Sequence, residues 1–399
     1  MLKIASSLLL TALTVLAQTD PPAPAYEEPP ALKAADLLKP EFATGPNHRV
    51  LEKVTTFDGR NRYTIETPWG YFIAEGDAML LSRVAEANAM GEIQRLMTTE
   101  EYQAALKVAE KSPIYATNIR ALNQAGISKF IGGGEEAAKE PANKVAVKEN
   151  RAVEEVKRGL ALHYGTDPYS TNEIYQLQLE KVAWTGAEGG VTFKLTPKPV
   201  GSEAGLELTT ENLAQNFQES LRGVSSTALR AVNKRALLAM KLDEKNADLF
   251  LKQPVFGPTR QTAIVRALDS LVNVKNRGAF VTLATRNAAV EADARFYSGT
   301  AQVLAKLHSG KDPLAALATL GGLPVAIAQD GRLIIALQWD TAFWSDLAEH
   351  FIDRAAAAKL GQKGPVVVVI TGSATPRFKA ELEKRKIGLV TNVFGGPQK

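Results

Sequence analysis

Apolar and polar residues alternate along the chain between residues 49 and 75, which is the period of a half-buried β-strand. The turn motifs Asp58-Gly59-Arg60-Asn61 and Pro68-Trp69-Gly70 divide this stretch into three short runs. The pattern therefore predicts a three-stranded antiparallel meander near the N-terminus.

After Gly76 the apolar positions recur at helical spacing. Thr98 and Glu101 have the spacing of a capping box, and Ser112-Pro113 places a capping residue before a proline, so each pair predicts a helix start. The glycines at 132–134 begin a stretch of mostly Ala, Glu and Lys that is typical of a linker. Further helices are predicted at 151–164, 171–184, 210–222, 225–241, 243–252, 258–273 and 278–308, the last with one break.

The C-terminal part of the chain changes period again. Asp330-Gly331 between two apolar runs predicts a β-hairpin. The β-branched run 365–371, a helix beginning at Thr375-Pro376 and a last strand at 387–393 predict a small α/β layer. The expected fold class is α+β and mainly helical, with an N-terminal antiparallel β-meander followed by helices, a central helical region and this C-terminal layer.

The first seventeen residues have the pattern of a secretory signal peptide. Lys3 precedes a short apolar run, and Val15 and Ala17 place small residues at the −3 and −1 positions of a cleavage site. The run is shorter than the roughly 20 apolar residues of a membrane anchor. The chain has no cysteine, which excludes both lipid attachment through a thiol and disulfides. We expect an exported bacterial protein, periplasmic or extracellular, without a transmembrane helix after cleavage.

These patterns together divide the chain into six segments. Residues 18–47 begin with a Pro-rich stretch that is expected to form an extended tether. The predicted organisation is a signal peptide at 1–17, the tether at 18–47, the β-meander with helices at 48–135, a linker at 136–150, a helical domain at 151–310 and an α/β domain at 311–399.

Composition and motifs give little evidence of chemistry. The net charge of +4 is small for 399 residues and does not indicate nucleic-acid binding. The basic residues between Arg222 and Lys252 suggest binding to nucleic acid or anionic lipid, but acidic residues are interspersed among them, which is typical of solvated helices. The sequence contains no dinucleotide, Walker, zinc-protease or nucleophile-elbow motif, so we expect no cofactor and lean against an enzyme.

Three groups of residues are candidate sites, each with a structural alternative. Asp346, Glu349, His350 and Asp353 share one side of a predicted helix and have metal-ligand chemistry, but they also form its solvated face, so no metal site is expected. Thr371, Ser373 and Arg377 surround a predicted helix start that favours an anion, although Thr375-Pro376 there is an ordinary helix beginning. His163 and Asp167 form a possible acid/base pair in a polar loop, where Ser170 and Glu173 also resemble a capping box.

Several stretches resemble motifs of an uncharacterised family of exported bacterial proteins. They are Tyr63 to Gly70, the loop Asp167 to Asn172 with Val182-Ala183-Trp184, and Thr371 to Pro376. The resemblance implies export and a shared architecture. It implies no activity, cofactor or catalytic residue.

Three functional hypotheses follow. The first is a non-catalytic binding or scaffolding component of the bacterial envelope, whose partner is an envelope protein or surface component. The second is a hydrolase or phosphate-ligand enzyme with a site near Thr371–Arg377 or His163–Asp167. The third is a peripheral membrane protein that contacts lipid through residues 119–131.

Overall fold

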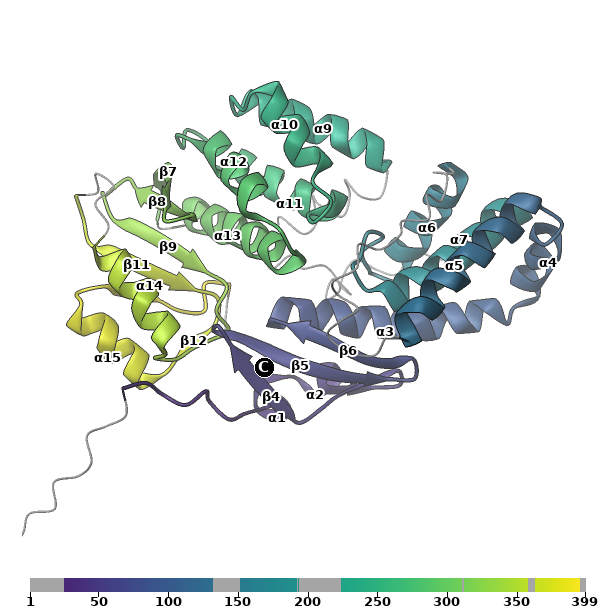
Figure 1. The fold of residues 1–399 in the computed structure, drawn as a ribbon, viewed down its shortest axis with the longest axis horizontal. Helices are drawn as coiled ribbons and strands as arrows, with labels where there is room; N and C mark the ends of the chain where they lie inside the picture. The colour runs from purple at the N-terminus through teal and green to yellow at the C-terminus, as the bar shows by residue number, and fades with distance from the viewer. Residues whose placement is uncertain are drawn as a thin grey trace, which may run out of the picture.

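A computed structural model describes residues 25–131, 151–191, 193, 224–310, 312–357 and 363–394. Figure 1 shows a small N-terminal sheet with one long helix, two groups of further helices and a C-terminal sheet flanked by helices. The predicted α+β class is confirmed. The predicted signal peptide 1–17, linker 136–150 and helix 210–222 lie outside the described residues.

The N-terminal sheet consists of β1 (Leu32–Lys33), β2 (Thr44–Gly45), β3 (His48–Val50), β4 (Lys53–Phe57), β5 (Arg60–Thr67) and β6 (Gly70–Glu75). The central strand β5 pairs with β3 and β4 along one edge and with β6 along the other. Asp58 and Gly59 have φ values of 49° and 78°, the left-handed conformation that a tight two-residue hairpin turn requires. The predicted meander is confirmed as β4, β5 and β6.

The stretch expected to be a tether differs from that expectation in its second half. Residues 32–45 form β1, α1 (Ala34–Leu37), α2 (Pro40–Ala43) and β2. Leu32 pairs with Val54 of β4, and Ala34 and Leu38 are buried in the core of the N-terminal sheet. These apolar side chains follow the Pro-rich stretch and stabilise a folded segment there, because they bury surface that an extended tether leaves in water.

Among the described residues, the helices that follow the N-terminal sheet are α3 (Asp77–Met97), α4 (Glu100–Ala109), α5 (Pro113–Ile131), α6 (Arg151–His163) and α7 (Glu173–Gly189). The long helix α3 packs its apolar face on the sheet, where Leu80 and Ile65 share one core. Helix α4 begins one residue later than predicted, because Thr99 accepts the capping hydrogen bond from the N–H of Tyr102 at 3.2 Å.

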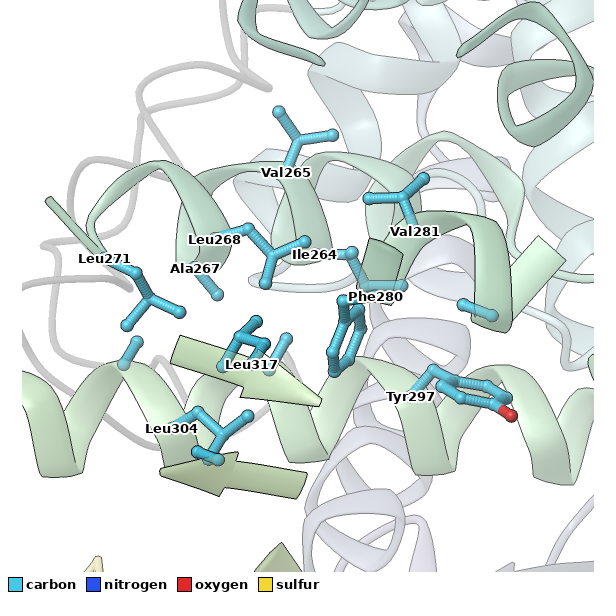
Figure 2. Close-up of a cluster of buried hydrophobic side chains, with 14 of the residues drawn as sticks. Ile264, Val265, Ala267, Leu268, Leu271, Phe280, Val281, Tyr297, Leu304 and Leu317 are labelled. Carbon is cyan, nitrogen blue, oxygen red and sulfur yellow. The ribbon is translucent and has the colours of Figure 1, made fainter. Parts of the chain in front are cut away.

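A second helical group contains α9 (Ser226–Ala239), α10 (Glu244–Lys252), α11 (Gly257–Asp269), α12 (Arg277–Asn287) and α13 (Glu291–Ser309). The break predicted within 278–308 lies between α12 and α13. Figure 2 shows that Leu268 of α11, Phe280 of α12 and Leu304 of α13 meet in one buried core.

The C-terminal sheet has the strand order β13-β11-β9-β8-β7, with β9, β11 and β13 parallel. Helices α14 and α15 cover one face, where Ile335 packs with Ile352 and Phe378, and α13 covers the other, where Leu304 packs near Ile334. The elements are β7 (Leu314–Leu320), β8 (Leu323–Ala328), β9 (Leu333–Leu337), β10 (Thr341–Ala342), α14 (Asp346–Ala356), β11 (Val366–Ile370), β12 (Ser373–Ala374), α15 (Pro376–Lys384) and β13 (Gly388–Val390).

The strand β7 was not predicted from the sequence. Leu314 and Leu317 recur at a spacing of three, which is typical of a helix. Gly321 and Gly322 have φ values of 56° and 91° and turn the chain back, so that β7 pairs with β8 as a hairpin. The described part of the chain contains no helix that combines the length and the apolar character of a membrane span.

Candidate functional site

The carboxyl ends of β9 and β11 form the edge at which open α/β sheets bind ligands. Here the N-terminal sheet covers the edge. The N–H of Thr341 donates to the carbonyl of Gly59 at 2.9 Å, and the N–H of Asn61 donates to Asp340 Oδ2 at 2.9 Å. A Cβ at Gly59 would lie 2.5 Å from the Trp339 ring, so the approach of the two sheets requires glycine.

Two carboxyl groups meet at this junction. Asp77, the first residue of α3, accepts hydrogen bonds from Tyr63 Oη at 2.6 Å and from Asn61 Nδ2 at 3.2 Å. Burial raises the pKa of Asp77 and of Asp340, and the charge of Asp77 raises the pKa of Asp340 further. At least one of the two carboxyl groups therefore tends to keep its proton. Sequence patterns give no signal for this pair, because Asp77 begins α3 and Asp340 lies between β9 and β10, far apart in the chain.

The residues of the predicted anion site form contacts within the protein. Thr371 Oγ1 donates to the carbonyl of Trp339 at 3.1 Å, and the N–H of Ser373 donates to the carbonyl of Asp340 at 2.9 Å. The guanidinium of Arg377 donates to the carbonyl of Ala25.

The chain supplies its own anion at the start of α15. Thr375 caps this helix, accepting from the N–H of Phe378 at 3.2 Å, and its hydroxyl donates to Glu27 Oε2 at 2.8 Å. The same carboxylate oxygen accepts from the N–H of Trp344. A carboxylate is favoured beside a helix N-terminus by the helix dipole. An external anion would therefore have to displace Glu27, and the described geometry serves to attach the N-terminal segment to the C-terminal sheet.

The loop between α6 and α7 contains the predicted acid/base pair. Asp167 Oδ1 accepts from the N–H of Tyr169 at 2.8 Å and from the hydroxyl of Thr259 at 2.6 Å. The ring of His163 contacts Tyr164 edge-on, with centroids 4.8 Å apart. Asn172, and not Ser170, caps α7. The contacts of Asp167 thus connect the loop to α11.

The rest of this loop surrounds a buried ion pair in α3. Arg83 and Glu86 lie 2.9 Å apart and are almost fully buried. Asn172 Nδ2 donates to Glu86 at 2.7 Å, and the guanidinium of Arg83 donates to Thr171 Oγ1 at 3.1 Å. Thr171 in turn donates to Glu291 of α13 at 2.6 Å. The density of polar residues in the loop therefore has a structural explanation, since they join α3 to the second helical group.

The acidic residues of α14 form hydrogen bonds and ion pairs with Tyr26, His350 and Arg385. His350 Nδ1 lies 3.4 Å from Asp346 Oδ1, whereas Asp353 and Glu349 pair with Arg385 at 2.7 and 3.1 Å. The hydroxyl of Tyr26 donates to Asp346 and to Glu349, each at 3.0 Å, and these bonds raise the pKa of Tyr26 to about 12. No group of three or more His, Asp or Glu side chains among the described residues is arranged to hold a metal ion.

An exposed apolar surface lies on the N-terminal sheet. We define the outer sheet face as Lys53, Phe57, Arg62, Tyr71 and Ile73, which point away from α3. Phe57, Tyr71 and Ile73 are 66%, 62% and 38% exposed. The alternating pattern of the meander predicts an outward face, but it does not predict that aromatic and β-branched residues occupy it.

This face continues to a sheet edge. The strand β6 pairs with β5 and with no other described strand. The N–H of Gly76 donates to the carbonyl of Asn61 at 2.7 Å, so the alternation of an antiparallel ladder turns the backbone groups of Phe72 and Ala74 toward β5. Tyr71 and Ile73 then direct their N–H and C=O groups to the open edge. The same two residues therefore offer both backbone hydrogen-bonding groups and exposed side chains.

Comparisons with known proteins were made at the level of families, sequences and structures. No protein-family model, curated protein or solved structure matches this chain significantly. The resemblance to exported bacterial proteins stays a prediction from the sequence motifs.

Proposed function

We propose that the protein is an exported, non-catalytic binding or scaffolding component of the bacterial envelope, which binds an extended segment of another protein along β6. The observation that carries the proposal is the coincidence of an open strand edge and exposed apolar side chains at Tyr71 and Ile73. An exposed edge is a ready template for another strand. The signal-peptide pattern of the first seventeen residues supports export.

The outer sheet face indicates the chemistry of the partner. In strand addition the backbone hydrogen bonds supply affinity, and alternate side chains supply specificity. Ile73 lies across from Thr64, and Tyr71 lies across from Glu66. Lys53 is an exposed cation on the same face, whereas Arg62 lies across from Glu75. A complementary segment carries apolar residues at alternate positions, where they lie beside Tyr71 and Ile73 on the outer sheet face.

The test uses a photoreactive amino acid at position 71 in the full-length exported protein. We expect crosslinks in envelope extracts to one partner, mapped by mass spectrometry to an extended segment. Ile73→Pro should reduce the crosslinked yield at least tenfold, because it removes an N–H that points to the open edge and is not needed for pairing with β5. Ile73→Thr, which keeps that N–H, should reduce the yield less.

The controls separate loss of binding from loss of folding. Leu347→Thr removes a comparable exposed aliphatic side chain from α14, and its crosslinked yield should equal that of the unmodified protein. Circular dichroism and thermal unfolding of Ile73→Pro establish that the sheet is intact. Equal yields for Ile73→Pro and the unmodified protein, or no crosslink above a tag-only sample, would contradict the proposal.

A further inference from the structure

A second exposed surface lies on the hairpin of α9 and α10, at the outer margin of the molecule in Figure 1. Residues 225–253 contain six basic and three acidic side chains. This stretch therefore carries an excess of three positive charges.

The acidic residues of the hairpin do not neutralise its outer surface. Lys234 pairs with both Glu244 and Asp248, at 2.7 and 2.9 Å. The third acid, Asp243, caps α10 by accepting from the N–H of Asn246 at 2.9 Å. The remaining cations are exposed; they are Arg230, Arg235, Lys241, Lys245 and Lys252. Of these, Lys245 lies near enough to Asp243 for its charge to help lower the pKa of that carboxyl group.

Aliphatic side chains lie among these cations. Lys245, Leu249 and Lys252 recur at positions i, i+4 and i+7 and so share one side of α10. On α9, Arg235 and Leu238 share a side in the same way. Leu238 and Leu249 are 41% and 49% exposed. We name Arg235, Leu238, Lys245, Leu249 and Lys252 the hairpin surface.

We propose that the hairpin surface binds the anionic phospholipid headgroups of a membrane, as a peripheral contact separate from β6. Lysine and arginine side chains are attracted to the negative potential of anionic lipids, and each strengthens binding roughly fivefold when it lies at the surface. Leucine side chains between them enter the boundary between headgroups and acyl chains. A helical hairpin at the margin of the molecule suits a flat lipid surface, and its aliphatic residues suit acyl chains.

The test is co-sedimentation of the full-length protein with two kinds of vesicle. One kind contains phosphatidylcholine alone, and the other contains phosphatidylcholine with about 30% of the anionic lipid phosphatidylglycerol. We expect binding to the anionic vesicles only, weakened at least tenfold between low and high salt because screening shortens the electrostatic range. The double variant Lys245→Glu/Lys252→Glu should lose at least tenfold in partition. Leu249→Gln should lose a smaller factor and keep the salt dependence.

The control moves the same charge change to another helix. Lys107→Glu/Lys111→Glu alters an exposed lysine of α4 and another in the turn after it, and this variant should bind the anionic vesicles within twofold of the unmodified protein. Equal losses in the two double variants would show a general effect of net charge and would overturn the proposal. Equal binding to the neutral and the anionic vesicles would also overturn the proposal. So would binding to polyglutamate without binding to vesicles, because that result would indicate an acidic protein as the partner. Ile73→Pro should leave vesicle binding unchanged, so the vesicle experiment tests the hairpin surface independently of the β6 proposal.

Discussion

Asp340 illustrates how a single side chain acquires its properties from the rest of the molecule. In the sequence it follows a strand as an ordinary acidic residue, with nothing to mark it. In the structure it lies at the junction of two sheets, facing Asp77, Tyr63 and the more distant charge of Arg60. The N–H of Asn61 partly stabilises the charged carboxylate of Asp340. Burial and the nearby Asp77 outweigh this effect and favour the protonated carboxyl group.

This residue predicts a pH dependence of stability. A carboxyl group whose pKa is raised by folding still holds its proton in the folded protein at pH values at which the unfolded chain has lost it. Its contribution to the free energy of unfolding therefore falls as the pH rises above about 4. Asparagine does not ionise, so Asp340→Asn removes this loss of stability at higher pH. We expect the variant to gain stability relative to the unmodified protein between pH 4 and pH 8, measured by urea unfolding at each pH.

A control of opposite sign is available in the β8–β9 turn. Hydrogen bonds from Arg332 lower the pKa of the exposed Asp330, which favours its charged form in the folded protein. Asp330→Asn should therefore lose stability relative to the unmodified protein as the pH rises through the acidic range. Parallel pH profiles for Asp340→Asn and the unmodified protein would contradict the assignment.

At the scale of elements, the loop between α6 and α7 shows where sequence reasoning stops. Its polar residues, Thr171 and Asn172 among them, suggested a catalytic or binding role. Their contacts are with Arg83 and Glu86 of α3, an ion pair that is buried and therefore needs hydrogen bonds to offset its desolvation. The loop residues supply those bonds.

We predict that Glu86→Gln destabilises the protein strongly. It leaves the buried guanidinium of Arg83 without its countercharge, which costs about 3–5 kcal/mol in free energy of unfolding. Glu92→Gln on the same helix is the matched control, because Glu92 pairs with Arg95 at the exposed surface and should cost less than about 1 kcal/mol. Urea unfolding monitored by circular dichroism measures the free energy of unfolding of both variants. Similar losses of stability would contradict the prediction that the buried ion pair matters more than the exposed one.

At the scale of the whole molecule, the N-terminal sheet and the C-terminal sheet are joined by a close approach that no local pattern encodes. Gly59 fits two requirements at once: a φ of 78° in the β4–β5 turn and contact with the Trp339 ring. The turn was predicted from the sequence, but the contact was not. Glu27 and Arg377 add a second connection between the two ends of the chain.

The junction predicts a difference between two glycines. Gly59→Ala and Gly257→Ala both force a left-handed alanine, which costs about 1–2 kcal/mol. Only at Gly59 does the new Cβ collide with Trp339, whereas nothing lies within 4 Å at Gly257. We expect Gly59→Ala to cost about 1–3 kcal/mol more, as overpacking typically does, and to change the near-ultraviolet circular dichroism of the tryptophans. Equal unfolding free energies for the two variants would contradict this.

The sequence by itself determined the α+β class, the β-meander, the hairpin at Asp330-Gly331 and most helix positions. These depend on interactions between neighbours in the chain: the period of apolar residues, capping side chains and turn residues. The strand β7 was missed because its leucines have a helical spacing, and its pairing with β8 decides its conformation.

Only the tertiary structure decided what the candidate residues contact. Thr371, Ser373 and Arg377 form hydrogen bonds with other groups of the protein, and Asp77 at the start of α3 lies near Asp340 between β9 and β10. The sequence predicted the strand β6, but its consecutive apolar residues 71–74 did not show which side chains face outward, and the open edge beside them depends on which strands pair. Periodicity is a property of neighbours along the chain, whereas burial, ion pairing and open edges depend on residues far apart in sequence that folding brings together.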